Sequence, residues 1–238
     1  MKLDILVIAA HPDDAELSCS GTILKHIHLG KKVGILDLTA GELGTRGSAE
    51  LRAKEAIKAS QIMRIHARDN VKLKDGFFEL NHENKLKIVP FIRTYRPEIV
   101  LCNAISDRHP DHGRAAQLAS DACFLSGLQK IESKYKSQNL SAWRSKNVYH
   151  YTQEYSFHPD FIVDISGFME QKIEAILAFK SQFYDPDSAE PQTPISKRSY
   201  IDFIKSRARV YGNFIGVEFG EGFTVSHPIG LNSLFDII

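Results

Sequence analysis

Cysteine is scarce in this 238-residue chain, and the three cysteines present form no C-x-x-C pair. They are Cys19, Cys102 and Cys123. This number and spacing argue against a disulfide-stabilised secreted fold and against a zinc site made of thiolates. We therefore expect a protein of the reducing cytoplasm, with Cys19 as a buried apolar residue and not a nucleophile.

An excess of charge is also missing, because 30 Lys and Arg residues face 29 Asp and Glu residues, for a formal net charge of +1. This balance gives no general field for nucleic acid or an anionic membrane. No run approaches the roughly 18 uninterrupted apolar residues of a membrane helix. The apolar opening at 3–10 carries Asp4 and no small-residue cleavage pattern, so we expect a strand there and not a signal peptide.

Nucleotide-binding glycine patterns are absent as well. The glycine-rich stretch 41–47 contains neither G-x-G-x-x-G nor G-K-[ST], which argues against a dinucleotide or a phosphate cradle. Apolar residues make up 43% of the chain and charged residues 25%, as in ordinary globular proteins. We expect one domain covering 1–238 and a small-molecule partner.

Short aliphatic runs alternate along the chain with segments of helical periodicity. The expected strands are 3–10, 33–38, 71–73, 98–102, 147–152 and 161–165; the expected helices follow the first strand, begin at Ser48, cover 81–95, begin near Asp111, and cover 167–182 and 199–212. Such alternation implies right-handed crossovers and a mainly parallel sheet. The predicted fold is α/β, Rossmann-like and doubly wound, with helices on both faces of the sheet.

Two histidine-containing tetrapeptides follow expected strands: His11-Pro12-Asp13-Asp14 after the first, and His109-Pro110-Asp111-His112 after the fourth. In the strand order 3-2-1-4-5 these two strands are neighbours at the point where the order reverses, which is where open α/β sheets bind ligands. We therefore expect the two motifs to converge.

A metal site fits this convergence. His11, Asp14 and His112 would supply two imidazoles and one carboxylate and leave positions open for water and substrate, as in catalytic zinc sites. The same ligands suit Fe(II), so we expect one ion per chain, with zinc favoured over iron. The alternative is that Pro and Asp simply begin helices. His158-Pro159-Asp160 shows that the tripeptide alone is not diagnostic, but two motifs at matching positions favour a site.

The chain resembles the LmbE-like, or PIG-L-like, zinc N-acetylglucosaminyl deacetylases, whose marks are a strand-terminal A-H-P-D-D and a later H-x-D-H. Both marks are intact, and the similarity continues through 41–47, 52–55 and Arg108 and covers nearly the whole chain. Segments 192–195 and 215–223 resemble the bacillithiol-pathway deacetylases in particular. The resemblance implies deacetylation of an N-acetylglucosaminyl conjugate such as N-acetylglucosaminyl-malate.

Residue roles follow from the resemblance at the matching positions. It implies that His11, Asp14 and His112 bind zinc, that Asp13 is the general base, and that His109 assists at the oxyanion. The chemistry of these residue types agrees, since a carboxylate beside a ligand can take a proton from the attacking water. We expect Asp111 to orient His109 and keep it protonated, with a helix N-cap as an equally good interpretation.

Arginines are the expected substrate-binding residues. Arg46 lies in the glycine-rich loop, Arg52 one turn into the next helix, and Arg108 beside His109, so all three can surround one crevice and hold an anionic aglycone such as malate. For Arg52, an exposed i,i+3 pair with Glu55 is the competing interpretation. For the aromatic residues near the C-terminus, core packing is the default; these are Tyr184, Tyr200, Phe219 and Phe223.

Two other functions are alternatives to deacetylation. A metal-dependent phosphoesterase would favour two metal ions, and few spare carboxylates accompany this ligand set. A sugar-binding module without turnover would not need Asp13 and His109. The resemblance also implies a homo-oligomer, such as a hexameric ring, to which the apolar segment 231–238 would contribute.

Overall fold

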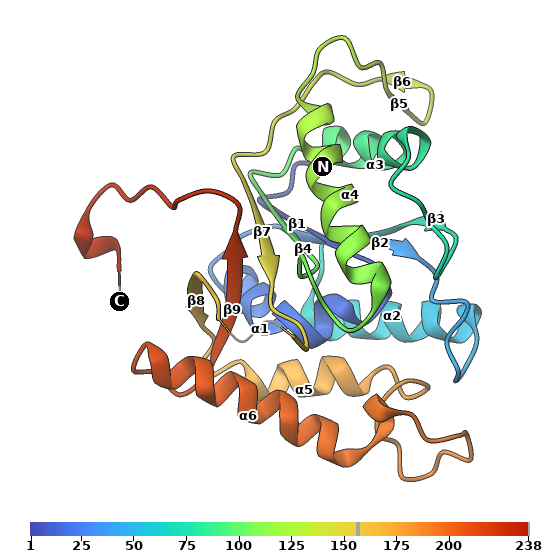
Figure 1. The fold of residues 1–238 in the computed structure, drawn as a ribbon, viewed down its shortest axis with the longest axis vertical. Helices are drawn as coiled ribbons and strands as arrows, with labels where there is room; N and C mark the ends of the chain where they lie inside the picture. Colours follow the sequence, from blue (N-terminus) through green and yellow to red (C-terminus); the bar gives the residue numbers. More distant parts are fainter. Residues whose placement is uncertain (156–157, 238) are drawn as a thin grey trace.

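The computed structural model describes residues 1–155 and 158–237, and its strands and helices alternate as expected (Figure 1). In chain order they are β1 (Ile5–Ala9), α1 (Asp14–His28), β2 (Val33–Thr39), α2 (Ala49–Met63), β3 (Ala67–Leu73), α3 (His82–Tyr95), β4 (Ile99–Cys102), α4 (Pro110–Ser126), β5 (Lys134–Tyr135), β6 (Gln138–Asn139), β7 (Asn147–Tyr151), β8 (Phe161–Asp164), α5 (Met169–Leu177), the 3₁₀ turn η1 (Pro194–Ser196), α6 (Arg198–Phe214), β9 (Gly220–Val225) and the 3₁₀ turn η2 (Leu234–Asp236).

The main sheet has seven strands in the order β3-β2-β1-β4-β7-β9-β8. The pairings from β3 to β7 are parallel, and β9 pairs antiparallel with both β7 and β8. The predicted Rossmann-like, mainly parallel sheet is therefore confirmed. β1 and β4 are neighbours, as the convergence of the two motifs requires.

Helices cover both faces of this sheet (Figure 1). One apolar core lies between the sheet and α1, α2, α5 and α6, and a second lies between the sheet and α3 and α4. Every residue of β1 and β2 is buried. Burial on both faces explains why these strands are nearly continuous aliphatic runs without polar alternation.

Strand β9 was not predicted from the sequence. Glycine lowers β-propensity, and this strand contains Gly220 and Gly222. Both are needed for close packing: a Cβ at Gly220 would lie 2.5 Å from Ile162 Cγ2, and one at Gly222 would lie 2.8 Å from Pro159 Cβ. The β5–β6 hairpin was also missed, because two-residue strands leave almost no pattern.

Two predicted boundaries were wrong. β3 begins at Ala67 and not at 71. Its first half was missed because it is polar: the partly buried Arg68 pairs there with Glu16 and Asp37, at 2.6 and 2.8 Å. The helix expected to reach 182 ends at Leu177, and tight turns continue the chain. Apolar periodicity does not distinguish such turns from a further helical turn.

Helix α1, which follows the first motif, is broken in its middle. The backbone angles of Cys19 (φ −136°, ψ 17°) are not helical, so the N–H groups after the break lack intrahelical partners. The Glu221 carboxylate of β9 accepts hydrogen bonds from two of them, Gly21 N at 2.9 Å and Thr22 N at 2.6 Å. Cys19 itself is fully buried, and burial raises its pKa well above the usual range, as expected of a core residue.

Lys172 of α5 also stabilises the break in α1. Its ammonium donates to the Leu17 carbonyl at 2.9 Å and to Glu221 Oε1 at 2.6 Å, and both charged side chains are buried. A buried ion pair offsets its desolvation only when its remaining polar atoms are also satisfied, as these are. We call Lys172 and Glu221 the helix clamp, because together they bind the chain on both sides of the break.

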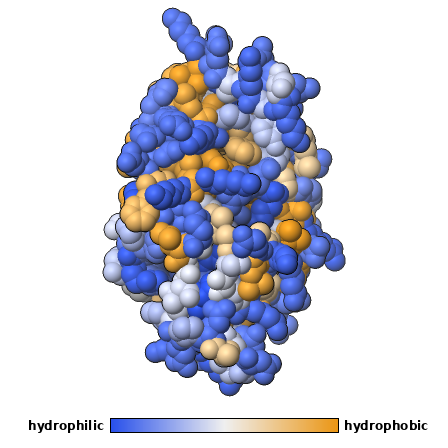
Figure 2. Space-filling view, turned by 90° about the vertical axis from the view of Figure 1, so that its right-hand side faces the viewer, coloured by the Kyte–Doolittle hydropathy of each residue, from blue (hydrophilic) through white to orange (hydrophobic). Residues whose placement is uncertain are grey.

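One face of the molecule is largely hydrophilic, with apolar patches between charged side chains (Figure 2). The C-terminal segment leaves the body of the protein (Figure 1), and Leu234, Phe235 and Ile237 are 83%, 97% and 60% exposed. Among the described residues, no helix has both the length and the apolar character needed to cross a membrane.

Candidate metal centre and active site

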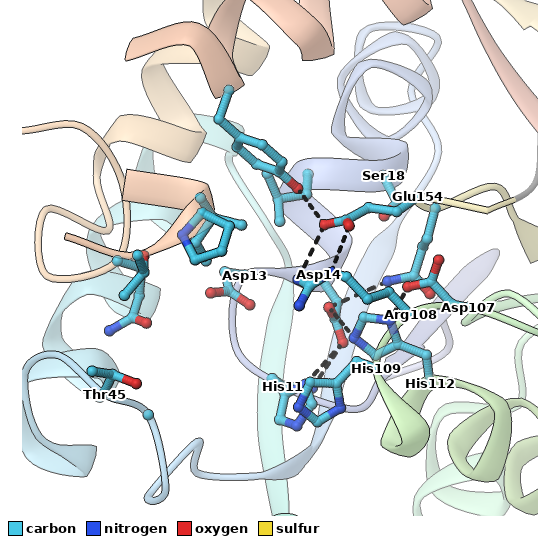
Figure 3. Close-up of a pocket in the computed structure, with 18 of the residues that line it drawn as sticks. His11, Asp13, Asp14, Ser18, Thr45, Asp107, Arg108, His109, His112 and Glu154 are labelled. Atoms are coloured by element: carbon cyan, nitrogen blue, oxygen red, sulfur yellow. Dashed lines mark hydrogen bonds and ion pairs between the residues drawn. The ribbon is translucent and has the colours of Figure 1, made fainter. Parts of the chain in front are cut away.

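A cavity of about 450 Å³ opens where β1 and β4 end, and both motifs contribute to its lining (Figure 3). Its walls also include the glycine-rich loop, the segment after β7 and the start of α6. The two tetrapeptides thus meet as expected at the carboxyl edge of the sheet.

The turn between β1 and α1 is strained at Asp13, whose φ of 123° and ψ of −24° lie outside the regions that side-chain-bearing residues favour. Asp14 holds this turn, because its Oδ2 accepts hydrogen bonds from His11 N and from Asn103 Nδ2, both at 3.0 Å. Asn103 follows β4, so the neighbouring strand fixes the orientation of the Asp14 carboxylate.

Asp14 lies within reach of both predicted histidine ligands. Asp14 Oδ1 is 3.1 Å from His112 Nε2, and Asp14 Oδ2 is 3.5 Å from His11 Nδ1. Among the described residues, two groups have possible ligand atoms that all lie within 4.8 Å of one another: His11, His109 and His112; and His11, Asp75 and Asp111. The first group joins the two predicted histidines to His109 and not to Asp14. This cluster of histidines and aspartates can hold a metal ion.

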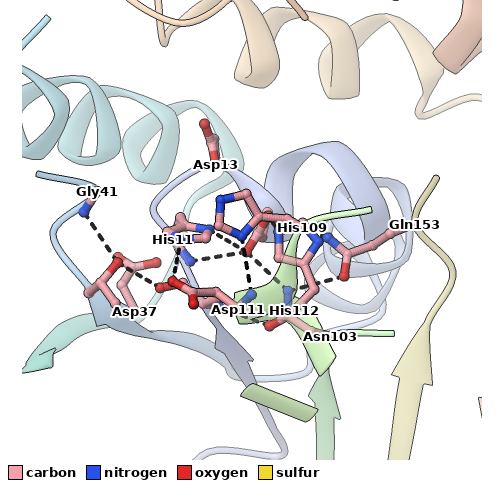
Figure 4. A network of polar contacts seen from close by, with 12 residues as sticks. His11, Asp13, Asp37, Gly41, Asn103, His109, Asp111, His112 and Gln153 are labelled. Carbon is pink, nitrogen blue, oxygen red and sulfur yellow. Dashed lines mark hydrogen bonds and ion pairs between the residues drawn. The ribbon is translucent and has the colours of Figure 1, made fainter. Parts of the chain in front are cut away.

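The outward nitrogens of two imidazoles are held by carboxylates. His112 Nδ1 lies 2.6 Å from Asp107 Oδ2, and His11 Nε2 lies 3.1 Å from Asp75 Oδ1. His11 Nε2 also lies 3.3 Å from Asp111 Oδ2 (Figure 4). His11 Nδ1 and His112 Nε2 therefore remain for a metal on the side of Asp14. Metal-binding histidines usually have such a carboxylate on the other nitrogen, so the residues fit a resident metal ion.

These contacts also set the ionisation of the ligands. Burial alone would lower the pKa of His112, but the Asp14 and Asp107 carboxylates raise it to about 9. The pKa of Asp14 is held well below its usual range, because the two facing histidines outweigh its burial. The ionised Asp14 carboxylate between the two histidines thus favours a positive charge, such as a metal ion, at this position.

Asp13 points away from this polar network and into the cavity (Figure 4). Burial raises the pKa of its carboxyl to about 7, against the opposing effect of Arg52, whose Nη2 lies 3.3 Å from Asp13 Oδ2. A general base works best when its pKa is near the working pH. Asp13 is therefore suited to accept a proton at neutral pH.

Arg52 is buried and lines the cavity, so the exposed Arg52–Glu55 pair is wrong. Glu55 instead accepts hydrogen bonds from Ser181 N and Oγ, at 2.7 and 2.6 Å. A Cβ at Gly41 (φ 66°) would lie 1.9 Å from Arg52 Nη1. Glycine at 41 is thus needed both for the backbone and for the passage of this guanidinium toward Asp13.

His109 lies between the other two histidines, with ring centroids 4.7 Å from His11 and 5.1 Å from His112. Its Nδ1 accepts a hydrogen bond from Asp111 N at 3.2 Å, so a neutral ring carries its proton on Nε2. Burial, then the charges of His11 and His112, lower the pKa of His109. A protonated His109 is therefore not needed, because the neutral ring already offers an N–H donor.

The predicted role of Asp111 toward His109 requires correction. Its carboxylate faces His11 Nε2 and Gly76 N, at 3.3 and 2.8 Å, and pairs with Arg114 at 2.7 Å. Only its main-chain N–H contacts the His109 ring. The alternative N-cap interpretation of Asp111 is also wrong, because His109 is the N-cap of α4 and Asp111 lies in the first turn. The Asp111 carboxylate orients His11 and not His109.

Comparisons with known proteins agree with this centre. A model of the PIG-L family, described as GlcNAc-PI de-N-acetylase, matches residues 6–123. The diacetylchitobiose deacetylase of Thermococcus kodakarensis is 31% identical over 231 residues, covering 92% of this chain and 81% of that protein. The chain belongs to the PIG-L family of deacetylases. It is accordingly an enzyme, an amidohydrolase that removes N-acetyl groups.

Two solved structures are similar to this PIG-L chain over most of its length. The conserved protein TT1542 from Thermus thermophilus is 35% identical, with a TM-score of 0.86, and the match covers 98% of each chain. The N,N'-diacetylchitobiose deacetylase from Pyrococcus horikoshii is 26% identical, with a TM-score of 0.79, covering 93% of this chain and 82% of that one.

Of the three predicted substrate-binding arginines of this PIG-L chain, Arg52 and Arg108 line the cavity as expected, and Arg46 does not. Arg46 is buried outside the cavity lining, where it donates to Ser188 Oγ at 2.5 Å. Arg108 lines the cavity but is neutralised by Glu154, with Nε–Oε2 and Nη2–Oε1 distances of 2.6 and 3.2 Å. Only Arg52 is both buried and directed at a predicted catalytic residue.

Several lining residues of the PIG-L cavity were missed from the sequence, and Tyr200, expected by default to pack in the core, packs against the core and also lines the cavity. Gln153 and Glu154 directly follow β7, whose carboxyl end lies beside that of β4. Tyr200 and Arg207 lie seven residues apart on α6 and so share one helix face. The end of β7 and the seven-residue spacing on α6 could have indicated that these residues lie near the cavity. Neither feature alone indicates what the residues do.

Proposed function

We propose that this PIG-L deacetylase hydrolyses the acetamide of an N-acetylglucosaminyl conjugate, using one divalent metal ion per chain held by His11, Asp14 and His112. The observation that supports it best is the arrangement of these ligands, with Asp107 and Asp75 on the outward nitrogens of the two histidines and Asp13 beside them. Zinc suits this donor set, and Fe(II) suits it as well.

A bound metal would polarise the acetamide carbonyl and lower the pKa of the attacking water. Asp13, with its pKa near 7, accepts the proton of that water. His109 donates a hydrogen bond from Nε2 to the oxygen on which negative charge develops. Asp13 then delivers its proton to the departing amine, which leaves acetate and the free amino sugar.

We propose N-acetylglucosaminyl-malate as the substrate. The support is the resemblance of segments 192–195 and 215–223 to the bacillithiol-pathway deacetylases, together with cationic side chains in the cavity lining. Diacetylchitobiose, on which the archaeal relatives are named to act, is the alternative. The two differ in the charge of the group attached to the N-acetylglucosamine.

The test measures release of primary amine by zinc-loaded protein from N-acetylglucosaminyl-malate, diacetylchitobiose and N-acetylglucosamine. We expect the highest kcat/KM with the malate conjugate. A preference for diacetylchitobiose would replace the substrate and keep the reaction. Absence of amine release from all three, with stoichiometric metal bound, would contradict the proposed reaction on N-acetylglucosaminyl compounds.

We also propose that residues 1–238 act as one domain and that the protein assembles into a homo-oligomer such as a hexamer. The support for assembly is the exposed apolar C-terminal segment, with Phe235 97% exposed. Contiguous exposed apolar surface commonly marks a contact between proteins. Light scattering coupled to size-exclusion chromatography tests this, and a 26.8 kDa particle at micromolar concentration would contradict it.

A further inference from the structure

Three arginines line the cavity: Arg52, Arg108 and Arg207. Two of them already face carboxylates of the chain, since Arg52 pairs with Asp13 and Arg108 pairs with Glu154. An arginine paired with a carboxylate adds little net attraction for a further anion. Arg207, the third arginine, is therefore the candidate source of substrate selectivity.

Arg207 projects from α6 and makes only neutral contacts. Its Nη1 donates to the Gln153 carbonyl at 2.8 Å, and its Nη2 lies 3.5 Å from the Leu17 carbonyl. Its guanidinium carbon is 5.5 Å from the centre of the Phe203 ring. Across residues 1–155 and 158–237, no carboxylate oxygen lies within 4.0 Å of its guanidinium nitrogens, so it keeps its full positive charge.

The contacts of Arg207 also fix its direction. Carbonyl oxygens on one edge and an aromatic ring against the guanidinium restrict its rotation. A restrained guanidinium binds a carboxylate with less loss of conformational entropy than a free lysine would. Tyr200, seven residues earlier, contributes a hydroxyl to the same wall.

Arg108, in contrast, already binds a carboxylate of the protein. Its fork binds Glu154 through two nitrogens, at 2.6 and 3.2 Å, and Tyr200 donates to the same carboxylate at 3.2 Å. A substrate carboxylate would have to displace Glu154 to bind there. At Arg207 no such displacement is needed.

We propose that Arg207 is the residue that recognises a carboxylate on the aglycone and so selects acidic N-acetylglucosaminyl conjugates. Charge-assisted Arg–carboxylate hydrogen bonds are among the stronger polar contacts in proteins. This inference rests on the proposed reaction for its biological meaning, but carboxylate binding can be measured without turnover.

The experiment compares Arg207→Gln with Arg108→Gln and Arg207→Lys. Binding of L-malate and of its dimethyl ester to the metal-free protein is followed by calorimetry. In Arg207→Gln, we expect malate to bind about 10–100-fold more weakly, the value of a hydrogen bond to a charged group. Arg207→Lys should recover part of this loss, Arg108→Gln should change it less than about threefold, and the ester should bind weakly throughout.

A kinetic arm separates this inference from the proposed function. The ratio of kcat/KM for N-acetylglucosaminyl-malate to that for neutral methyl N-acetylglucosaminide should fall at least tenfold in Arg207→Gln alone. Circular dichroism and metal content identify a variant that fails to fold, in which case Arg207→Lys decides. The proposal is overturned if wild-type protein binds no malate at millimolar concentration, or if Arg108→Gln causes the larger loss. Malate binding that depends on Arg207 without acetamide hydrolysis would instead overturn the proposed reaction.

Discussion

Replacing Asp14 by alanine is expected to leave the protein without tightly bound metal and without measurable deacetylase turnover. Asp14 is the carboxylate between His11 Nδ1 and His112 Nε2, at 3.5 and 3.1 Å, so its loss removes the one anionic ligand and leaves two neutral imidazoles. Metal content after dialysis, measured by atomic emission, and amine release in the same samples check this prediction.

Asp107→Asn provides a graded control for the Asp14 variant. Asp107 Oδ2 contacts the outward nitrogen of His112, and its Oδ1 accepts a hydrogen bond from Tyr155 N at 3.0 Å. Losing such a carboxylate beside a ligand typically weakens metal affinity about 10–100-fold. Its metal should therefore be retained at high zinc concentration, where Asp14→Ala stays empty. Stoichiometric metal in Asp14→Ala after dialysis would show that the ion is held by other residues, and the three histidines would then be the candidates.

The second large effect is expected from Asp13→Asn, which should lower kcat by about 10²–10⁴-fold, the usual value of a general base. Asparagine keeps the size of the side chain and can still accept a hydrogen bond from Arg52, whose Nη2 lies 3.3 Å away. It cannot accept the proton of the attacking water. Metal content should remain at the wild-type level, because Asp13 points away from the ligand cluster.

Single-turnover kinetics with saturating substrate and metal analysis of the same preparation separate this outcome from its alternatives. An unchanged kcat with intact metal would show that Asp13 is not the base. A variant that lost its metal would instead show that the strained turn at Asp13 depends on the carboxylate. The contrast between Asp13→Asn and Asp14→Ala thus tests whether adjacent aspartates have separate functions.

The sequence was sufficient to predict the sheet from β1 to β7 and the meeting of the two motifs. Strands buried on both faces leave aliphatic runs, and parallel pairing brings their carboxyl ends to one edge. It was also sufficient to bring His11, Asp14 and His112 together, because the segments that carry them follow β1 and β4. That these three residues bind the metal remains a prediction. For Arg52, the sequence left two alternatives open: a position in the crevice and an exposed pair with Glu55.

What could not be predicted depends on contacts between segments far apart in the chain. Arg46 lies in the glycine-rich loop and Arg108 directly precedes the second motif, yet Ser188 and Glu154 decide where their guanidinium groups point. Asp111 turns to His11 because Gly76 N and Arg114 hold its carboxylate there. No local spacing reports which acceptor a long side chain reaches, so charge neutralisation in the cavity became visible only with the fold.

The helix clamp has a consequence for when α1 takes its final shape during synthesis. All predicted metal ligands have left the ribosome once His112 has emerged, but Glu221 binds the main chain of Gly21, 200 residues earlier. Until β9 is made, the main-chain N–H groups after the break in α1 lack this acceptor. Chains are made from the N-terminus, so we expect the middle of α1 to reach its final packing only after every predicted metal ligand has been synthesised.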